Sequence, residues 1–333
     1  MVNNEPRICQ ETDSYVRHYP VLVELANKQL EKQFWTSSEM KVELDRMQLL
    51  YGLEENQFHA AKTVLHLFLR YELMVGRFWE DVVAKTFPRP EVQLASSVVA
   101  MTERAIHAEF YNQLNVILGM DSDEDYTAYV NDPVLNDRVK WLGEVMGQED
   151  KILATIIFSM TETALLFSSF AILKSFQSNG YNLLPVIVRG TNQSAIDEDL
   201  HGIISAEIIN TYYSEKGEKL EDDTERYEAV KKAVLHAYDH ECRIIEMAFL
   251  EDTLNGVTKE DLKAFVRYRL NLYLERIQLP LMFPVEDCKI VDWFEKNTYS
   301  YKMVDFFTSG VGMEYESSWD DVGFGKCWER GNK

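Results

Sequence analysis

The sequence predicts an all-α protein in which long helices pack into a bundle. Three observations support this fold class: long stretches have helical periodicity, the eight prolines lie at the edges of those stretches, and no short run alternates convincingly as a strand would. The chain has 333 residues, and its 46% hydrophobic content is enough for a sizeable core. We find no internal repeat.

Each predicted helix is bounded by local signals. Glu54 and Glu55 place negative charge in a first turn, where it suits the helix dipole. The second helix follows Pro88 and Pro90, and Pro185 stands where a first helical turn tolerates proline. The predicted helices are residues 53–85, 91–118, 136–176 with a break near Gly147, 185–213, 225–250 and 259–277.

The last part of the chain has a different composition. Residues 297–333 are rich in Gly, Ser, Asp and aromatic residues and have no helical period, so we expect an extended or mobile tail. The predicted organisation is a helical domain with an N-terminal arm at 1–296, followed by the C-terminal tail at 297–333.

The net charge indicates which binding partners are expected, and the cysteines indicate the cellular compartment. With 34 basic and 55 acidic residues the formal charge is −21, which argues against nucleic acid, because proteins meet its phosphates with Lys and Arg. The four cysteines show no paired spacing and are expected to be reduced thiols. No signal peptide is recognised at the start, so we expect a cytoplasmic protein.

One segment is long and apolar enough to cross a membrane. Residues 152–173 have this property, but Glu162 lies at their centre, where an ionisable group is costly in lipid. The same pattern suits the central helix of a large bundle, apolar on all sides. We therefore expect a buried helix and no membrane contact, and the buried carboxylate needs an explanation.

Four of the predicted helices each carry an acidic residue within an apolar run, and two of them add a histidine one turn later. Residues three or four apart share a helix face, so a Glu and a His at this spacing can bind one metal ion together. Two such helices, with one Glu from each of two others, predict the dimetal-carboxylate site of ferritin-like bundles. Four crowded carboxylates would otherwise repel one another. The candidate ligands are Glu72, Glu103, His107, Glu162, Glu198 and His201.

Each candidate also has an ordinary interpretation. A single Glu-x-x-His is common on helices and is usually a solvated pair, His107 could be a satisfied core histidine, and Glu72 could pair with Arg77. Glu162 is the hardest to explain in this way. The joint pattern on four helices is much less expected by chance than any one of its members.

These residues resemble the small, radical-generating subunit of class I ribonucleotide reductase, and the resemblance covers most of the chain. His107 followed by Tyr111 resembles the family's His-x-x-x-Tyr, and Asp197-Glu198-x-x-His201 resembles its most specific motif. The remaining similar segments are Phe34-Trp35 with Ser38-Glu39, the later helix at 265–270, and Phe306-Phe307 and Glu314-Tyr315 in the tail.

The resemblance implies a fold, a reaction and residue roles. It implies a ferritin-like bundle with two metal ions, Fe/Fe first and Mn/Mn or Mn/Fe as alternatives, bound by the six candidate ligands. Tyr111 would carry a tyrosyl radical, Trp35 and Asp197 would relay it with Asp197 hydrogen-bonded to His107, and Tyr315 would pass it on. The partner would be the large subunit, which reduces ribonucleotides, and the small subunit would be a homodimer. Without the resemblance, Tyr111 could be a core tyrosine, Trp35 a packing residue and Tyr315 an exposed aromatic.

The sequence departs from the family pattern at three places. Glu103 and His107 are four residues apart instead of three, which a π-helical turn between them would absorb; otherwise Arg104 would take the position of the Glu. The first ligand is Glu72, where Asp is usual, so the metal identity stays open. Residues 189–194 are unusually polar, which indicates either a distorted helix or a wet channel.

Two other functions compete with a reductase subunit. A related dimetal oxidase or monooxygenase would need a substrate cavity beside the metals and no relay tail. A non-enzymatic iron-binding bundle would store metal, but such proteins are usually shorter and form shells. Replacement of Tyr111 by Phe separates them, because only the reductase subunit would lose activity with its metals still bound.

Overall fold

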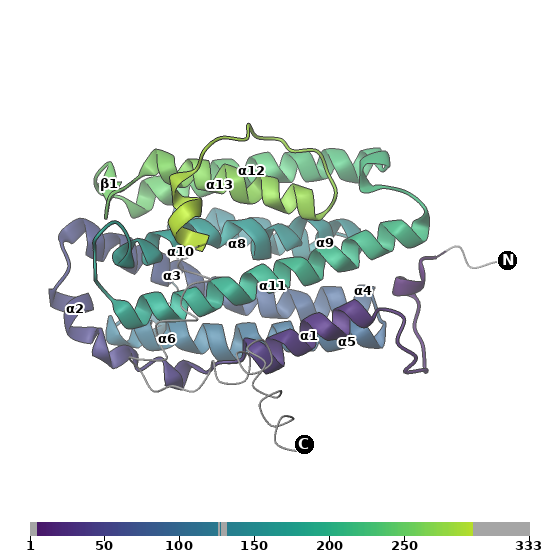
Figure 1. The fold of residues 1–333 in the computed structure, drawn as a ribbon, viewed down its shortest axis with the longest axis horizontal. Helices are drawn as coiled ribbons and strands as arrows, with labels where there is room; N and C mark the ends of the chain where they lie inside the picture. Colours follow the sequence, from purple (N-terminus) through teal and green to yellow (C-terminus); the bar gives the residue numbers. More distant parts are fainter. Residues whose placement is uncertain (1–4, 126, 128–131, 296–333) are drawn as a thin grey trace, which may run out of the picture.

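The computed structural model describes residues 5–125, 127 and 132–295. In that part of the chain nearly all regular structure is helical, and the long helices lie side by side along one direction (Figure 1). The α-helices are α1 Pro20–Lys32, α2 Arg46–Tyr51, α3 Glu55–Phe78, α4 Ala84–Thr86, α5 Pro90–Met101, α6 Ala108–Ile117, α8 Pro133–Gly147, α9 Lys151–Met160, α10 Phe167–Lys174, α11 Pro185–Lys216, α12 Thr224–Ala248 and α13 Lys259–Arg276. One short hairpin pairs β1 Thr253–Leu254 with β2 Val257–Thr258.

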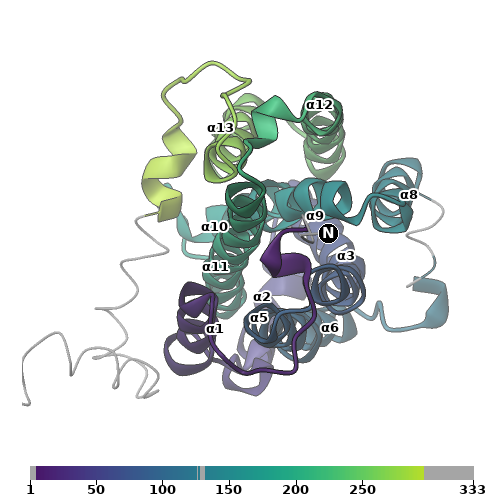
Figure 2. The same ribbon diagram turned by 90° about the vertical axis from the view of Figure 1, so that its right-hand side faces the viewer.

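The helices predicted from the sequence are present, which confirms the all-α fold class. The predicted 136–176 stretch is divided after Gly147, where α8 ends, and α9 starts at Lys151 with the side chain of Asp150 capping it. The helical patterns do not predict α1 and α2. Both lie in what the sequence indicated only as an N-terminal arm, and α1 packs along α5 (Figure 2).

Three π-helical turns interrupt the long helices. They are Trp79–Val83 after α3, Thr102–His107 between α5 and α6, and Thr161–Leu165 between α9 and α10. A π turn inserts one residue into the helix and changes which side chains face the core, and such turns are frequent at functional sites. Two of them carry candidate ligands.

The long apolar segment is a core helix. Residues Lys151–Gln177 are hydrophobic enough to cross a membrane, but the most apolar window of this stretch is entirely buried inside the protein. Its neighbours are α8, α11 and α13, so it runs through the middle of the bundle (Figure 2). The interpretation of this segment as a buried bundle helix is consistent with this packing.

Helix α11 is continuous through the polar stretch at 189–194. Gly190 is required there because a Cβ at this position would overlap the ring of Phe110, which is fully buried. The polar residues have no need of a distorted helix: Thr191, for example, donates its hydroxyl to the Ile187 carbonyl at 2.9 Å within the same helix. The glycine in this stretch therefore serves close packing between α11 and α6.

Candidate dimetal centre

Six buried side chains from four helical segments meet in the middle of the bundle. Each is at most 1% exposed. They form two overlapping groups of four, and within each group the ligand atoms lie within 4.8 Å of one another. One group is Glu72, Glu103, His107 and Glu198, and the other is Glu103, Glu162, Glu198 and His201.

Glu103 and Glu198 belong to both groups and lie between the two histidines. Nδ1 of His107 is 3.4 Å from Oε2 of Glu103 and 3.1 Å from Oε1 of Glu198. Nδ1 of His201 is 2.8 Å from Oε1 of Glu103 and 3.6 Å from Oε2 of Glu198. Each of these two carboxylates thus presents one oxygen to each histidine, which is the arrangement of a bridging ligand.

Glu72 and Glu162 each belong to one group only. Oε2 of Glu72 is 3.6 Å from Nδ1 of His107, and Oε2 of Glu162 is 3.7 Å from Nδ1 of His201. The cluster can therefore hold two cations, with one terminal carboxylate and one histidine at each position.

The four-residue spacing between Glu103 and His107 is accommodated by the π-helical turn Thr102–His107. Both side chains are fully buried, whereas Arg104 points outward and its guanidinium pairs with Glu80 at 2.8 Å. The alternative in which Arg104 takes the place of the glutamate is wrong. One additional residue in the turn brings Glu103 inward without breaking the helix.

The carboxyl groups of the cluster have shifted pKa values because they are buried close to one another and to the two histidines. Burial and the charge of Glu103 raise the pKa of Glu72 well above its usual value, and burial and the charge of Glu198 raise the pKa of Glu162 to about 8. Burial also opposes ionisation of Glu103, but attraction to His107 outweighs it and lowers the pKa of Glu103 to about 2.

The ligand atoms fit metal ions. Both oxygens of Glu72, Glu103 and Glu198, and Nδ1 of both histidines, lack a hydrogen bond of normal geometry. Buried polar atoms in native proteins are normally satisfied, so such a group of orphaned atoms indicates ligands for something else. Carboxylate oxygens and imidazole nitrogens suit first-row metals, and two divalent ions neutralise four carboxylates.

Asp197 connects the cluster to Trp35. Oδ2 of Asp197 lies 3.0 Å from Nε2 of His107 and accepts a hydrogen bond from Nε1 of Trp35 at 2.8 Å. Gln29 on α1 donates to the other oxygen of Asp197 at 2.9 Å. Gln29 is not among the residues predicted from the sequence, because α1 itself was not predicted. All four side chains are buried.

Tyr111 is fully buried one helical turn after His107. Its ring stacks on Phe68 with 4.5 Å between centroids and meets the edge of Phe110 at 4.9 Å. Phe68 also stacks on Phe170 at 5.0 Å. Burial and the charge of Glu72 raise the pKa of the Tyr111 phenol well above 10. The phenol is therefore neutral and shielded from solvent.

Sequence reasoning missed a tryptophan at the cluster. Trp79 lies on the π turn after α3, is 1% exposed, and donates its indole N–H to Glu162. Its position seven residues after Glu72, two turns along the same helix, was the available signal. Tyr315, the predicted tail residue, lies outside the described residues.

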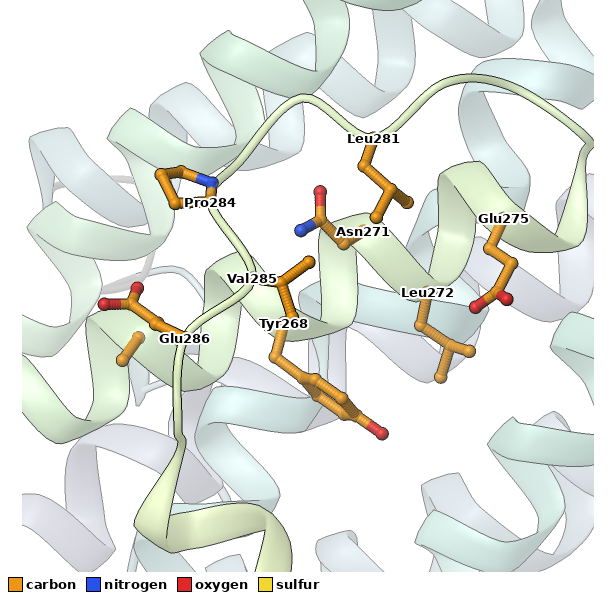
Figure 3. A pocket seen from close by; sticks show the side chains of 9 residues that line it. Tyr268, Asn271, Leu272, Glu275, Leu281, Pro284, Val285 and Glu286 are labelled. Atoms are coloured by element: carbon orange, nitrogen blue, oxygen red, sulfur yellow. The ribbon is translucent and has the colours of Figure 1, made fainter.

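The surface pockets are separate from the cluster. A pocket of about 170 Å³ lies between α13 and the segment that follows it, where Tyr268, Leu272 and Val285 line it (Figure 3). Two others, of about 220 and 480 Å³, lie beside Arg269 and beside Pro90. None of the six cluster residues lines any of these three pockets.

Comparison with known proteins agrees with the resemblance seen in the sequence. The family model "Ribonucleotide reductase, small chain" matches residues 17–289. No curated protein sequence matches the chain significantly. Among solved structures, the ribonucleotide reductase R2 subunit from Clostridium botulinum superposes with a TM-score of 0.70 at 17% identity, over 84% of this chain and 88% of that one.

A second solved structure has the same fold. The dimanganese(II)-NrdF of Streptococcus sanguinis superposes with a TM-score of 0.68 at 17% identity, covering 87% of this chain and 99% of its own. The expected ferritin-like bundle is confirmed, and the family together with the buried carboxylate and histidine cluster supports a dimetal-binding site. The chain belongs to the family of the ribonucleotide reductase small chain and is a component of that oxidoreductase.

Proposed function

We propose that this chain generates a tyrosyl radical on Tyr111 and passes the oxidising equivalent to a ribonucleotide reductase large subunit. The observation that carries the proposal is the contact of one carboxylate, Asp197, with both His107 and Trp35. An iron-storage bundle has no use for such a connection, and an oxidase would use a substrate cavity instead.

The six cluster residues would hold two metal ions, and Glu103 and Glu198 belong to both groups of candidate ligands. When bound and exposed to oxygen, the metal pair supplies a strong one-electron oxidant. We propose Fe/Fe, with Mn/Mn and Mn/Fe as the alternatives; the dimanganese form of the Streptococcus sanguinis relative is the reason to test manganese. The Glu72 carboxylate at the first ligand position leaves this choice open.

Tyr111 would lose one electron and its hydroxyl proton to become the radical. The rings of Phe68 and Phe110 exclude water from it, which would prolong its lifetime. Asp197 accepts a hydrogen bond from the Trp35 indole and fixes the orientation of His107, as carboxylates beside metal-bound histidines do. The electron that reduces the radical would come through Trp35.

The remaining parts of the proposal come from the family. Membership implies a large-subunit partner and an oligomeric small subunit, and we propose a homodimer acting in the cytoplasm. Tyr315 and the 297–333 tail would contact the large subunit and continue the relay. Neither a nucleic acid nor a membrane partner is part of the proposal.

The test begins with metal-free protein, loaded without oxygen with Fe(II), Mn(II) or both. Oxygen is then admitted, the bound metals are counted, and the electron paramagnetic resonance spectrum is recorded. We expect about two metals per chain, as a complete site requires, and a tyrosyl signal that is absent in Tyr111→Phe with both metals retained. The matched control is Tyr71→Phe, which alters another fully buried tyrosine and should keep the signal.

The alternatives make different predictions. Two metals with no radical under any loading would favour an oxidase, and no stoichiometric metal would contradict the dimetal site itself. The relay is tested separately by Trp35→Phe, which removes the hydrogen bond to Asp197. That variant should form the radical but lose ribonucleotide reduction with the large subunit.

A further inference from the structure

Arg269 on α13 reaches the π-helical turn that carries Glu162. Its Nε donates a hydrogen bond to the carbonyl oxygen of Thr163 at 2.8 Å, and Thr163 is the residue after Glu162. The guanidinium lies over the ring of Phe167, 3.4 Å from the centroid, and Arg269 is only 4% exposed. A helix outside the turn therefore supplies a hydrogen-bond partner to a carbonyl within it.

The same guanidinium contacts the helix that carries Glu198 and His201. Nη2 of Arg269 donates to Oδ1 of Asp199 at 3.4 Å. Arg276, two turns further along α13, donates to the same oxygen at 2.6 Å and to the backbone carbonyl of Asp199 at 3.4 Å. Asp199 lies between Glu198 and His201 on α11. Helix α13 is therefore attached to two of the three segments that supply the group Glu103, Glu162, Glu198 and His201.

The close approach of these segments depends on Gly202. A Cβ at this position would overlap Oγ1 of Thr163 and would lie 2.8 Å from Nη1 of Arg276. The glycine thus lets α11, the π turn and α13 meet at one point. This packing requirement is independent of the hydrogen bonds and points to the same three segments.

Burial makes Arg269 a costly residue to keep. Desolvation lowers the pKa of its guanidinium to about 10, although the carboxylate of Asp199 opposes the shift. Removal of a charged group from water is unfavourable unless its partners compensate, so Arg269 is expected to serve a purpose beyond general packing.

We propose that Arg269 is a positioning residue for the metal position formed by Glu103, Glu162, Glu198 and His201: it fixes the π turn of Glu162 against α11 through Thr163 and Asp199. The inference rests on the proposed dimetal function. The other position, with Glu72 and His107, has no ligand on either segment except the shared Glu198, and so depends less on Arg269.

The test is a Mn(II) titration of Arg269→Gln, followed by calorimetry and electron paramagnetic resonance. We expect the second Mn(II) to bind about 10- to 100-fold more weakly, the range typical when a residue that orients a ligand is removed. The affinity for the first Mn(II) should change by no more than a few-fold. With Mn(II) added at one equivalent more than the two sites hold, the unaltered chain should show the spectrum of a coupled Mn(II) pair. The Arg269→Gln spectrum should shift toward the six-line signal of an isolated Mn(II).

A matched control lies two residues away on the same helix. Arg267→Gln removes a guanidinium that pairs with Glu260 and Glu286 at the surface, and it should leave both affinities unchanged. Arg269→Lys keeps the positive charge but loses the planar guanidinium that donates to two partners at once. It should restore part of the affinity for the second Mn(II). If Arg269→Gln does not fold, Asp199→Asn tests the same connection from α11 and should weaken the second metal selectively.

Two results would overturn the inference. One is unchanged binding of both metals in folded Arg269→Gln, and the other is an equal loss at both positions. Failure of the proposed function is distinguishable, because it would show in the unaltered chain as the absence of a bound metal pair or of the tyrosyl signal.

Discussion

The indole nitrogen of Trp79 donates a hydrogen bond to Oε1 of Glu162 at 2.5 Å. Oε2 of the same carboxylate lies 3.7 Å from His201. The two carboxylate oxygens thus have different surroundings: Oε1 accepts a hydrogen bond from Trp79, and Oε2 faces the other residues of the cluster. Because Trp79 lies on its own π-helical turn, a distortion in one helix orients a candidate ligand on another helix.

Replacement of Trp79 by Phe should loosen Glu162 without emptying the core, because the aromatic ring is largely retained. Loss of this hydrogen bond leaves a buried carboxyl oxygen unpaired, which is expected to lower the free energy of unfolding of the metal-free protein by about 1–3 kcal/mol. Metal affinity should fall about 10- to 100-fold. Urea denaturation and metal titration measure the two effects. The control is Trp141→Phe, which alters a half-buried tryptophan on α8. Equal changes in stability and metal affinity for the two variants would show that the hydrogen bond has no influence on Glu162.

Gly190→Ala should destabilise the protein, although alanine is the better helix former. The added methyl would overlap Phe110, whose ring contacts both Tyr111 at 4.9 Å and Trp35 at 5.6 Å. Overpacking typically costs about 1–3 kcal/mol, which exceeds the gain of about 1 kcal/mol in helix propensity. Equilibrium unfolding in urea gives the net change.

The matched control for this substitution is Gly143→Ala. A Cβ at position 143 on α8 meets no neighbour within 4 Å, so this variant should be as stable as the original chain or more stable. If both variants gain stability, the close approach of α11 and α6 is not the reason for Gly190.

The metal-free protein should lose stability below neutral pH partly through His240. Nδ1 of this residue accepts a hydrogen bond from Arg138 at 2.8 Å, so the buried imidazole is neutral; burial and the charge of Arg138 lower its pKa to about 3. Because the ordinary pKa of His is 6.5, unfolding takes up a proton below that pH. The contribution of neutral His240 to the free energy of unfolding is therefore fully present above pH 6.5 and is lost progressively as the pH falls toward 3.

The measurement compares the pH dependence of the unfolding free energy with that of His240→Gln, since glutamine can accept from Arg138 but cannot be protonated. Between pH 6.5 and 5 the original chain should lose about 2 kcal/mol more than the variant. Parallel curves for the two proteins would mean that His240 takes up its proton equally well in the folded state.

Local sequence patterns predict much of the secondary structure of this protein and its candidate ligands. The helical period and the prolines predict the positions of α3, α5, α6 and α8 to α13, because side-chain periodicity is a property of each helix alone. The four-residue interval between Glu103 and His107 left two alternatives, a π-helical turn or Arg104 in the place of the glutamate, and the π-helical turn is present. The six candidate ligands were identified by their spacing and their apolar surroundings; their roles as ligands, like those of Tyr111, Trp35, Asp197 and Tyr315, stay predictions.

Other features depend on contacts between distant parts of the chain. Spacing along a helix determines which residues share a face, but it does not determine which helices oppose one another. Only the tertiary structure places Glu103 and Glu198 between both histidines, brings Gln29 to Asp197, and joins Arg269 to Thr163 and Asp199. These pairs are separated by about 70 to 170 residues in sequence, and the packing of the whole bundle is what brings them within hydrogen-bonding distance.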